Sequence, residues 1–260
     1  MTDNGSRTTN SGRWGLLLGR CTFPPAGTEV TCAVSGGPDS LALLVLAVAA
    51  GCRATAVHVD HGLRPGSGAD AAVVAGAAAR VGARFRAERV DIGAGPNLEA
   101  RARTARYAVL PPDVLTGHTA DDQAETALLN LLRGAGLDGL AGMRPERHPI
   151  LGLRRADTAE VCRVAGLSPV ADPSNDDPAH RRNRVRHELL PLLDAIAERE
   201  VVPVLARQAG LLRDEAALLD QLAGALDPTD AAALAAAPAA LARRAVRRWL
   251  SAGCEHPPQA

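Results

Sequence analysis

The stretch EVTCAVSGGPDSLALLVLAVAA, residues 29–50, decides the fold class of this chain. Its short, β-branched beginning predicts a buried strand, Glu29–Val34. The glycine-rich segment SGGPDS, Ser35–Ser40, follows directly. Pro38–Ala50 predicts an apolar helix with proline in its first turn, where the missing N–H costs nothing. A strand that runs through a glycine loop into a helix is typical of a phosphate-binding site.

Strand and helix patterns alternate along the residues that follow. Further strands are predicted at Arg53–Asp60, Arg84–Asp91 and Asp113–Gly117, and further helices at Ala69–Val81, Asn97–Leu110 and Thr119–Leu132. This order predicts an α/β fold, with a parallel twisted sheet and helices on both faces. Its ligands should gather at the carboxyl ends of the strands. Later, Ile150–Arg155 predicts a further short strand, and Thr158–Ala165 and Arg181–Ile196 predict helices.

Composition divides the chain into three expected segments. Residues 1–12 are polar and predict a disordered tail, and residues 13–195 hold the α/β pattern. Alanine and leucine then recur at helical spacing with breaks at Pro228 and Pro238, so residues 196–260 predict a small all-helical appendage. The chain ends soon after it, as a short form or a truncated fragment would. Neither a secretory signal nor a membrane-spanning stretch is evident, which predicts a cytoplasmic protein with no membrane partner.

Charge and cysteine usage exclude several classes of protein. The 29 basic residues balance 29 acidic ones, so a nucleic acid would have to be held by a local basic patch. All the basic residues are arginine. The five cysteines are scattered and form no C-x-x-C pair. This argues against a zinc ribbon, a cysteine-held iron–sulfur cluster and a redox dithiol.

The SGGPDS loop has the chemistry of a phosphate cradle. Its glycines let backbone amides approach phosphate oxygens, and the hydroxyls of Ser35 and Ser40 add hydrogen bonds. No lysine follows, so the loop matches neither the P-loop of kinase-like enzymes nor the dinucleotide fingerprint. The Asp39 carboxylate would repel phosphates unless a cation lay between them, which predicts Mg²⁺ at Asp39. The structural alternative is a strand-to-helix turn that Asp39 caps.

The segment GHTADDQAET, Gly117–Thr126, carries the strongest cluster of charge. His118, Asp122 and Glu125 stand at i, i+4 and i+7, on one face of the predicted helix. Two carboxylates three residues apart can bind an amino group of a substrate. The structural alternative is a helix start, with Thr119 as the N-cap and Asp122 as its capping-box partner.

The segment HVDHGLR, His58–Arg64, ends the second predicted strand on the same rim as the glycine loop. Strand alternation sends His58 and Asp60 to one face and His61 into the loop that follows. Too few further ligands stand at fixed spacing for a zinc site.

Two basic helices are candidates for phosphate contact. Arg103 and Arg106 occupy adjacent positions on one predicted helix, and the segment RRNRVRHE concentrates four arginines. Contact between that second helix and phosphates would give salt-dependent binding with little sequence information. For both helices a solvated charged face is the alternative. The predicted RNA-binding residues are Arg181, Arg182, Arg184 and Arg186.

The SGGPDS loop resembles the pyrophosphate-binding loop of the N-type ATP pyrophosphatases. Within that superfamily the chain is similar to the tRNA(Ile)-lysidine synthetases from about Val30 to Leu193. The motifs that carry this resemblance are His58–Arg64, Gly117–Thr126, Leu132–Gly136, Asp172–Asn175 and Arg182–Arg186. It implies that residues 13–195 form the catalytic domain, with an adenine nucleotide alpha hydrolase-like fold.

The resemblance also implies roles for single residues. ATP contacts are implied for Ser35, Gly36, Gly37, Pro38, Asp39, Ser40, His58, Asp60, Gly117 and Arg133. Catalytic roles are implied for Asp39, His61, Arg64, Arg106, His118 and Asp121. Asp122 and Glu125 would recognise free lysine, Arg106 a phosphate or the target base, and His118 or a carboxylate would accept the proton of the lysine amine.

The implied reaction uses ATP and Mg²⁺ to adenylate the wobble cytidine of isoleucine tRNA with a CAU anticodon. Free L-lysine then attacks carbon 2, which gives lysidine and changes the codon read from AUG to AUA. The enzyme would be a monomer or a homodimer. Alternatives that share the loop are a tRNA thiolase that delivers sulfur to an adenylated base, an amidotransferase-type synthetase and a non-catalytic ATP-binding module.

Overall fold

The computed structural model of the chain describes residues 14–60, 62, 67–91, 93, 98–170 and 177–253. Its contacts divide the chain into two compact units. Met1–Asp122 and Arg144–Asp177 make the first, here called the sheet unit. Gln123–Met143 and Pro178–Ala260 make the second, the helical unit. From the sequence, the catalytic domain is predicted to end at residue 195. The two compact units are defined by contacts and not by activity, so that boundary stays a prediction.

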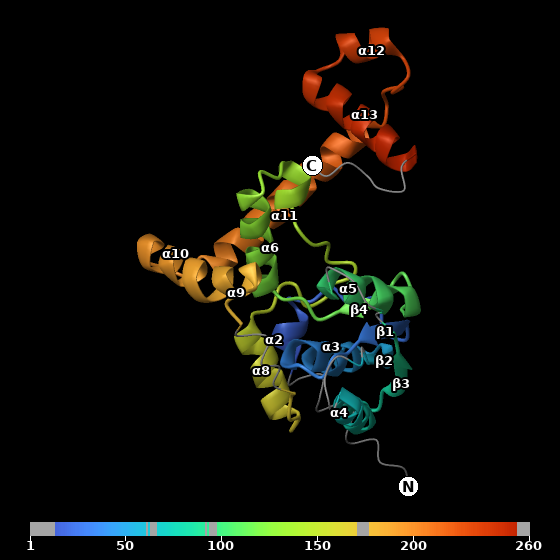
Figure 1. Cartoon of the computed structure of the whole chain (residues 1–260), viewed down its shortest axis with the longest axis vertical. Helices are drawn as coiled ribbons and strands as arrows, with labels where there is room; N and C mark the ends of the chain where they lie inside the picture. Colours follow the sequence, from blue (N-terminus) through green and yellow to red (C-terminus); the bar gives the residue numbers. More distant parts are fainter. Residues whose placement is uncertain are drawn as a thin grey trace. The chain divides into compact units, whose positions relative to one another are not determined.

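One parallel sheet organises the described part of the sheet unit (Figure 1). Its strands are β1 (Glu29–Ala33), β2 (Arg53–Asp60), β3 (Arg84–Arg89) and β4 (Leu115–Thr116), in the order β3-β2-β1-β4. The chain moves from β1 to β2 and β3, then returns to place β4 on the other side of β1. The order therefore reverses between β1 and β4, and the loops after these two strands are where ligands of such sheets bind.

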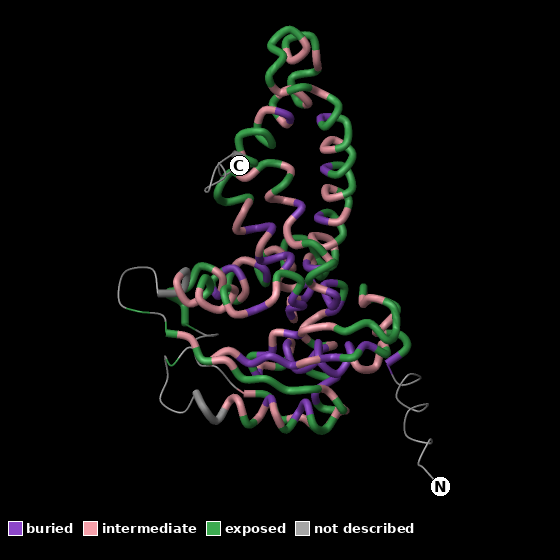
Figure 2. The backbone as a smooth tube through the Cα atoms, turned by 90° about the vertical axis from the view of Figure 1, so that its right-hand side faces the viewer, coloured by how far each residue is buried: buried purple, intermediate pink, exposed green. Residues whose placement is uncertain are grey.

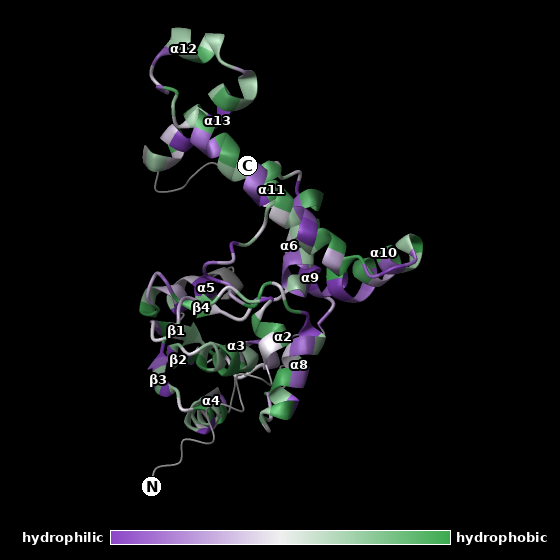
Figure 3. Ribbon diagram, turned by 180° about the vertical axis from the view of Figure 1, so that it is seen from behind, coloured by the Kyte–Doolittle hydropathy of each residue, from purple (hydrophilic) through white to green (hydrophobic). Residues whose placement is uncertain are grey.

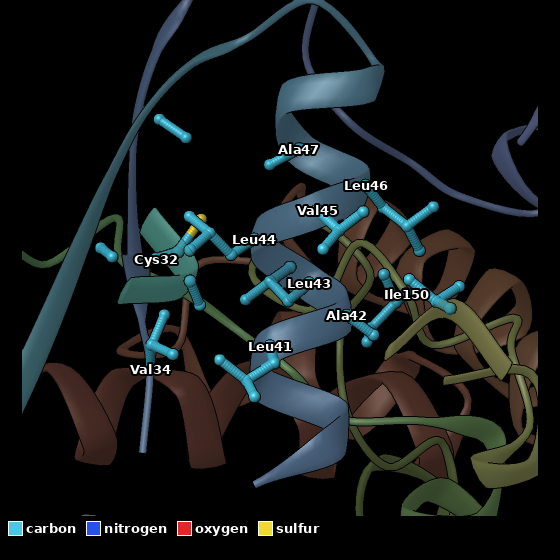
Figure 4. Packing of buried hydrophobic residues seen from close by; sticks show 14 of the residues in the cluster. Cys32, Val34, Leu41, Ala42, Leu43, Leu44, Val45, Leu46, Ala47 and Ile150 are labelled. Carbon is cyan, nitrogen blue, oxygen red and sulfur yellow. The ribbon is translucent and has the colours of Figure 1, made fainter. Parts of the chain in front are cut away.

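Helices cover both faces of this sheet, as predicted. The helices α3 (Pro38–Ala49) and α4 (Ser67–Val81) pack with Ala54 and Ala56 of β2 in the main core. Figure 4 shows Leu41 to Ala47 of α3 in that core beside Cys32 and Ile150. Figure 2 shows the buried positions gathered on the sheet and the helices next to it.

The opposite face carries α5 (Leu98–Val109). Val57 of β2 packs there against Leu110 and Val114, with Tyr107 of α5 at the edge of the cluster. Alternate side chains of β2 therefore serve two cores, which is why this strand is apolar on both faces. The predicted α/β class is confirmed.

One predicted strand is wrong. Ile150–Arg155 contains a turn that leads into α8 (Arg155–Val164). Ile150 and Leu153 are fully buried in the main core. The apolar spacing of this segment therefore reflects core packing at a turn and not a ladder of strand hydrogen bonds. The short helix α2 (Gly15–Leu18) precedes β1.

The described part of the helical unit contains no strand. Its helices are the greater part of α6 (Ala120–Leu132), then α7 (Leu137–Leu140), α9 (Arg181–Arg184), the π-helix η2 (Val185–Leu189), α10 (Leu190–Ala197), α11 (Val202–Ala223), α12 (Ala231–Ala236) and α13 (Ala239–Gly253). Figure 3 shows hydrophobic and hydrophilic residues mixed along α11 and α13. None of the helices in the described ranges is long and apolar enough to cross a membrane. The C-terminal helices fit the predicted all-helical appendage.

Candidate active site

The SGGPDS loop closes on itself at the carboxyl end of β1. Gly36 has φ +97° and would bring a Cβ within 3.1 Å of Val170 Cγ2, so the position requires glycine. The Ser40 hydroxyl donates to Gly37 O over 2.9 Å and accepts from Ser35 N–H over 3.2 Å. Gly37 is the N-cap of α3 and supplies no side-chain cap. The first backbone N–H groups of α3 therefore lie at the N-terminus of the helix, where the helix dipole favours an anion.

Gly117 brings the loop after β4 into backbone contact with this helix start. A Cβ on Gly117 would lie 2.7 Å from Asp39 O and 2.9 Å from Ser40 N. Any side chain at this position would therefore displace backbone. The two loops meet where the strand order reverses, which is the location that the topology predicts for a ligand.

Asp39 lies at this junction with its side chain 25% exposed. The Thr158 hydroxyl donates to its carboxylate, and Arg155 Nε lies 3.8 Å away. Burial raises the pKa of the Asp39 carboxyl to about 6, and the hydrogen bond from Thr158 opposes that rise. The oxygens of this carboxylate are the hard ligands that Mg²⁺ takes. No group of three or more His, Cys, Asp or Glu residues that could hold a metal ion occurs in the described ranges.

The acidic residues at the start of α6 meet the start of α8. Arg154 Nε and Nη2 donate to the two oxygens of Asp121, each over 3.1 Å, and Arg155 N–H donates to Oδ2 over 2.9 Å. Arg155 Nη2 also donates to Asp122 Oδ1 over 2.6 Å. Asp122 Oδ2 accepts from both the N–H and the hydroxyl of Thr119. The predicted cap is therefore present, and one carboxylate both caps a helix and binds a cation.

Glu125 is fully buried within the helical unit. Arg182 Nε and Arg186 Nε donate to its two oxygens, each over 2.8 Å. Arg184 pairs with Glu188 at 3.0 Å on the same helical segment. Three of the four predicted RNA-binding arginines thus form ion pairs inside this unit.

Two histidines share one hydroxyl at the end of β4. Thr116 Oγ1 lies 2.8 Å from His118 Nδ1 and 2.6 Å from His148 Nδ1, and the rings meet edge to face with centroids 4.6 Å apart. Burial, aided by His118, Arg147 and Arg103, lowers the pKa of His148 to about 4. A neutral His148 can accept the Thr116 proton, and Thr116 Oγ1 can then accept a hydrogen bond from His118 Nδ1.

Comparison with known proteins identifies the family. The PP-loop domain family matches residues 19–193. A protein from Nocardia farcinica is 46% identical over 245 residues, covering 88% of this chain and 77% of its own length. One from Mycolicibacterium paratuberculosis is 47% identical over 240 residues, covering 85% and 74%, and one from Thermobifida fusca is 44% identical over 257 residues, covering 88% and 79%. All three are named tRNA(Ile)-lysidine synthase.

The chain belongs to the tRNA(Ile)-lysidine synthase family. The predicted resemblance is confirmed, and with it an ATP-using enzyme of the ligase class. A solved structure of a U34-tRNA thiolase from Methanococcus maripaludis is similar with a TM-score of 0.58 at 15% identity, covering 79% of both chains. At that identity the likeness shows the fold alone.

The structure brings some of the predicted lysidine synthase residues together and leaves others apart. Asp39, Gly117, His118, Asp121 and Asp122 come together in the sheet unit. His58 Nδ1 lies 2.9 Å from Val34 O beneath the glycine loop, while Asp60 Oδ1 accepts from Gly62 N–H at 2.8 Å. Arg106 lies over the Tyr107 ring. His61, Arg64 and Asp172–Asn175 lie outside the described residues.

Arg133 and Glu125 belong to the helical unit. Arg133 lines a groove of about 520 Å³ there, with Arg181 and Arg184 also on its wall. The residues that sequence reasoning missed are Thr116, His148, Arg154, Arg155 and Thr158. Apart from His118, which stands two residues after Thr116, the site partners of these residues stand 32 to 119 residues away along the chain, so no local pattern signals them.

Proposed function

We propose that this chain joins free L-lysine to carbon 2 of the wobble cytidine in isoleucine tRNA with a CAU anticodon, at the expense of ATP. The observation that carries the proposal is the junction of the SGGPDS loop and the Gly117 loop, because it joins a phosphate cradle to an acidic amine-binding helix start. The lysidine synthase relatives support the choice of substrates.

ATP would lie with its outer phosphates on the amides at the start of α3. Ser35 and Ser40 add hydroxyls there, and His58 and Asp60 end the neighbouring strand toward the nucleoside. Mg²⁺ held by Asp39 would neutralise charge on the departing pyrophosphate. The cytidine O2 attacks the α-phosphorus, an O–P bond forms, and pyrophosphate leaves.

The second step forms the carbon–nitrogen bond. Asp122 would hold a lysine ammonium group in place of the Arg155 guanidinium that it binds in this structure. The other amino group of this lysine, in its neutral form, attacks carbon 2, the C–O bond breaks, and AMP leaves with that oxygen. His118 Nε2 accepts the proton, while Thr116 and His148 fix the ring.

The remaining assignments are part of the same proposal. Residues 13–195 form the catalytic domain and residues 196–260 the appendage. Glu125 contributes to lysine recognition, and Asp121 lies toward the nucleotide or the metal. His61 and Arg64 act near the reacting atoms, and Arg106 contacts a phosphate or the target base of the RNA. Arg133 and Arg181 contact substrate from their loop and helix. The enzyme works in the cytoplasm as a monomer or a homodimer.

Incubation with ATP, Mg²⁺, radiolabelled lysine and the tRNA transcript tests the function. We expect label in the tRNA, with one AMP and one pyrophosphate per lysine. A transcript whose wobble base is not cytidine is the control and should remain unlabelled. Transfer of sulfur from a sulfur donor in place of lysine would overturn the proposal in favour of a thiolase.

A further inference from the structure

Three arginines surround the ring of Tyr107 in the sheet unit. Their guanidinium carbons lie 5.1 Å (Arg103), 5.4 Å (Arg106) and 5.7 Å (Arg147) from the ring centroid. Arg103 and Arg106 come from α5, and Arg147 comes from the segment beside β4, where its carbonyl accepts from Thr116 N–H at 2.9 Å. Each distance is within the range of a cation–π contact.

The positive charge of this arginine cluster is not neutralised within the described ranges. None of Arg103, Arg106 and Arg147 forms an ion pair there with a described carboxylate. Elsewhere in the same unit, Arg154 and Arg155 do. Two further observations point to an excess of positive charge. Arg147 and Arg103 both help to lower the pKa of His148. On the same helix, Arg101 has Nε and Nη1 buried without a hydrogen-bond partner among the described residues.

We propose that Arg103, Arg106 and Arg147, arranged around Tyr107, form a binding site for backbone phosphates of the RNA substrate. This inference rests on the proposed function. A guanidinium offers a planar pair of donors that matches phosphate oxygens. Tyr107 is anchored against Val57, so the ring holds the three cations close together without a carboxylate.

RNA fits this site better than the phosphates of ATP. Arg103 and Arg147 are exposed, which suits a chain that passes over the surface, whereas the glycine loop already offers a cradle for the nucleotide. The arginines of α9 and η2 are less suited to the task, because Arg182, Arg184 and Arg186 are occupied by Glu125 and Glu188. A contact of this kind positions the tRNA and reads no base.

Tyr107 gives a direct probe, since it is the single tyrosine of the chain. The full chain labelled with 3-fluorotyrosine should show one ¹⁹F resonance. We expect the tRNA transcript to shift it, and ATP with Mg²⁺ to leave it in place. An unmoved resonance in tRNA-bound protein, or a full shift with ATP alone, overturns the site.

Charge variants test the same site by affinity. Arg147→Gln and Arg103→Gln should each weaken tRNA binding roughly tenfold near physiological salt. Each should also flatten the slope of log affinity against log salt by about 0.7 to 0.9. Arg147→Lys, which keeps the charge and loses the fork, should fall between wild type and Arg147→Gln.

Arg163→Gln is the matched control. Arg163 is an exposed arginine of the same unit that pairs with Glu160, so its loss should change tRNA affinity less than twofold. Equal losses in Arg163→Gln and Arg147→Gln would overturn the site. Because tRNA binding is measured without lysine, the arginine cluster and the proposed function are tested independently of each other. Cluster-dependent tRNA binding without lysine transfer refutes only the proposed function, and lysine transfer with unchanged Arg147→Gln binding refutes only the cluster.

Discussion

Asp122 and Glu125 stand one helical turn apart on α6, yet their surroundings differ sharply. The Asp122 side chain is 14% exposed, accepts from Thr119 N–H at the start of its own helix and pairs with the Arg155 guanidinium. The Glu125 side chain is 0% exposed and accepts two, from Arg182 and Arg186. The two carboxylates also belong to different compact units.

This difference suits Asp122 to ligand binding and Glu125 to the stability of the fold. A partly exposed carboxylate can exchange a cation such as the Arg155 guanidinium for a substrate ammonium group. A buried carboxylate between two guanidiniums is fixed, because removing it leaves positive charges without a partner. We therefore expect changes around Asp122 to alter ligand binding without loss of folding, and changes at Glu125 to lower the stability of the helical unit in addition to any loss of lysine recognition.

The largest effect is expected at Glu125. Glu125→Ala should lower the free energy of unfolding of the helical unit by about 3 kcal/mol, since breaking a buried pair strands Arg182 and Arg186. Denaturant unfolding followed by circular dichroism measures it. Glu188→Ala, which breaks an exposed pair with Arg184, is the control and should cost less than about 1 kcal/mol. Equal losses of unfolding free energy in Glu125→Ala and Glu188→Ala would contradict the structural role given to Glu125.

Gly117→Ala should come next. Its Cβ would press on Asp39 and Ser40 backbone, so the loop must move, and ATP affinity should fall roughly thirtyfold, about 2 kcal/mol. Equilibrium dialysis with labelled ATP gives the value. Gly76→Ala in α4 is the matched control, because no atom lies within 4 Å of the added Cβ, and it should bind ATP normally.

Asp122→Asn probes the other carboxylate. Loss of one charged hydrogen-bond acceptor should raise the KM for lysine roughly tenfold and leave the Kd for ATP within about twofold. Steady-state lysine transfer at varied lysine and separate ATP titration measure the two. A parallel loss of ATP binding would place Asp122 on the nucleotide instead and cancel the contrast with Glu125.

The smallest effect concerns the raised pKa of Asp39. Because the folded pKa, about 6, lies above the usual value, the folded protein holds this proton more tightly, and that contribution to stability is lost as pH rises toward 6. Mg²⁺–ATP needs the carboxylate form. Its affinity should therefore fall about fourfold from about pH 7 to about pH 5.5. In Asp39→Asn the fall should disappear, and a fall that persists would assign it to another group.

The elements around the opening strand could be predicted because each is locally consistent. β2 matches its predicted bounds, Arg53–Asp60, and the loop and α3 follow from glycine and proline chemistry. Ile150–Arg155 was misassigned because a short apolar run does not distinguish a strand from a buried turn. The π-helix η2 inside the predicted Arg181–Ile196 helix leaves no mark in composition.

A residue of the candidate site could be predicted where the local sequence shows both its structural position and its chemistry. Asp122 is such a residue, since its capping position and its charge are both local. Arg154 and Arg155 are not, because their carboxylate partners lie more than thirty residues earlier and are met only through folding. His148 likewise meets His118 only through folding. The Thr116 hydroxyl that joins them is not indicated by the sequence around either histidine.

The backbone contact at Gly117 has a consequence for cooperativity. A nucleotide that orders the start of α3 at Asp39 also orders Gly117 and, through it, the residues that begin α6. Lysine arriving second at Asp122 then meets a segment that is already fixed and loses less conformational entropy on binding. The two small substrates should therefore bind with positive cooperativity.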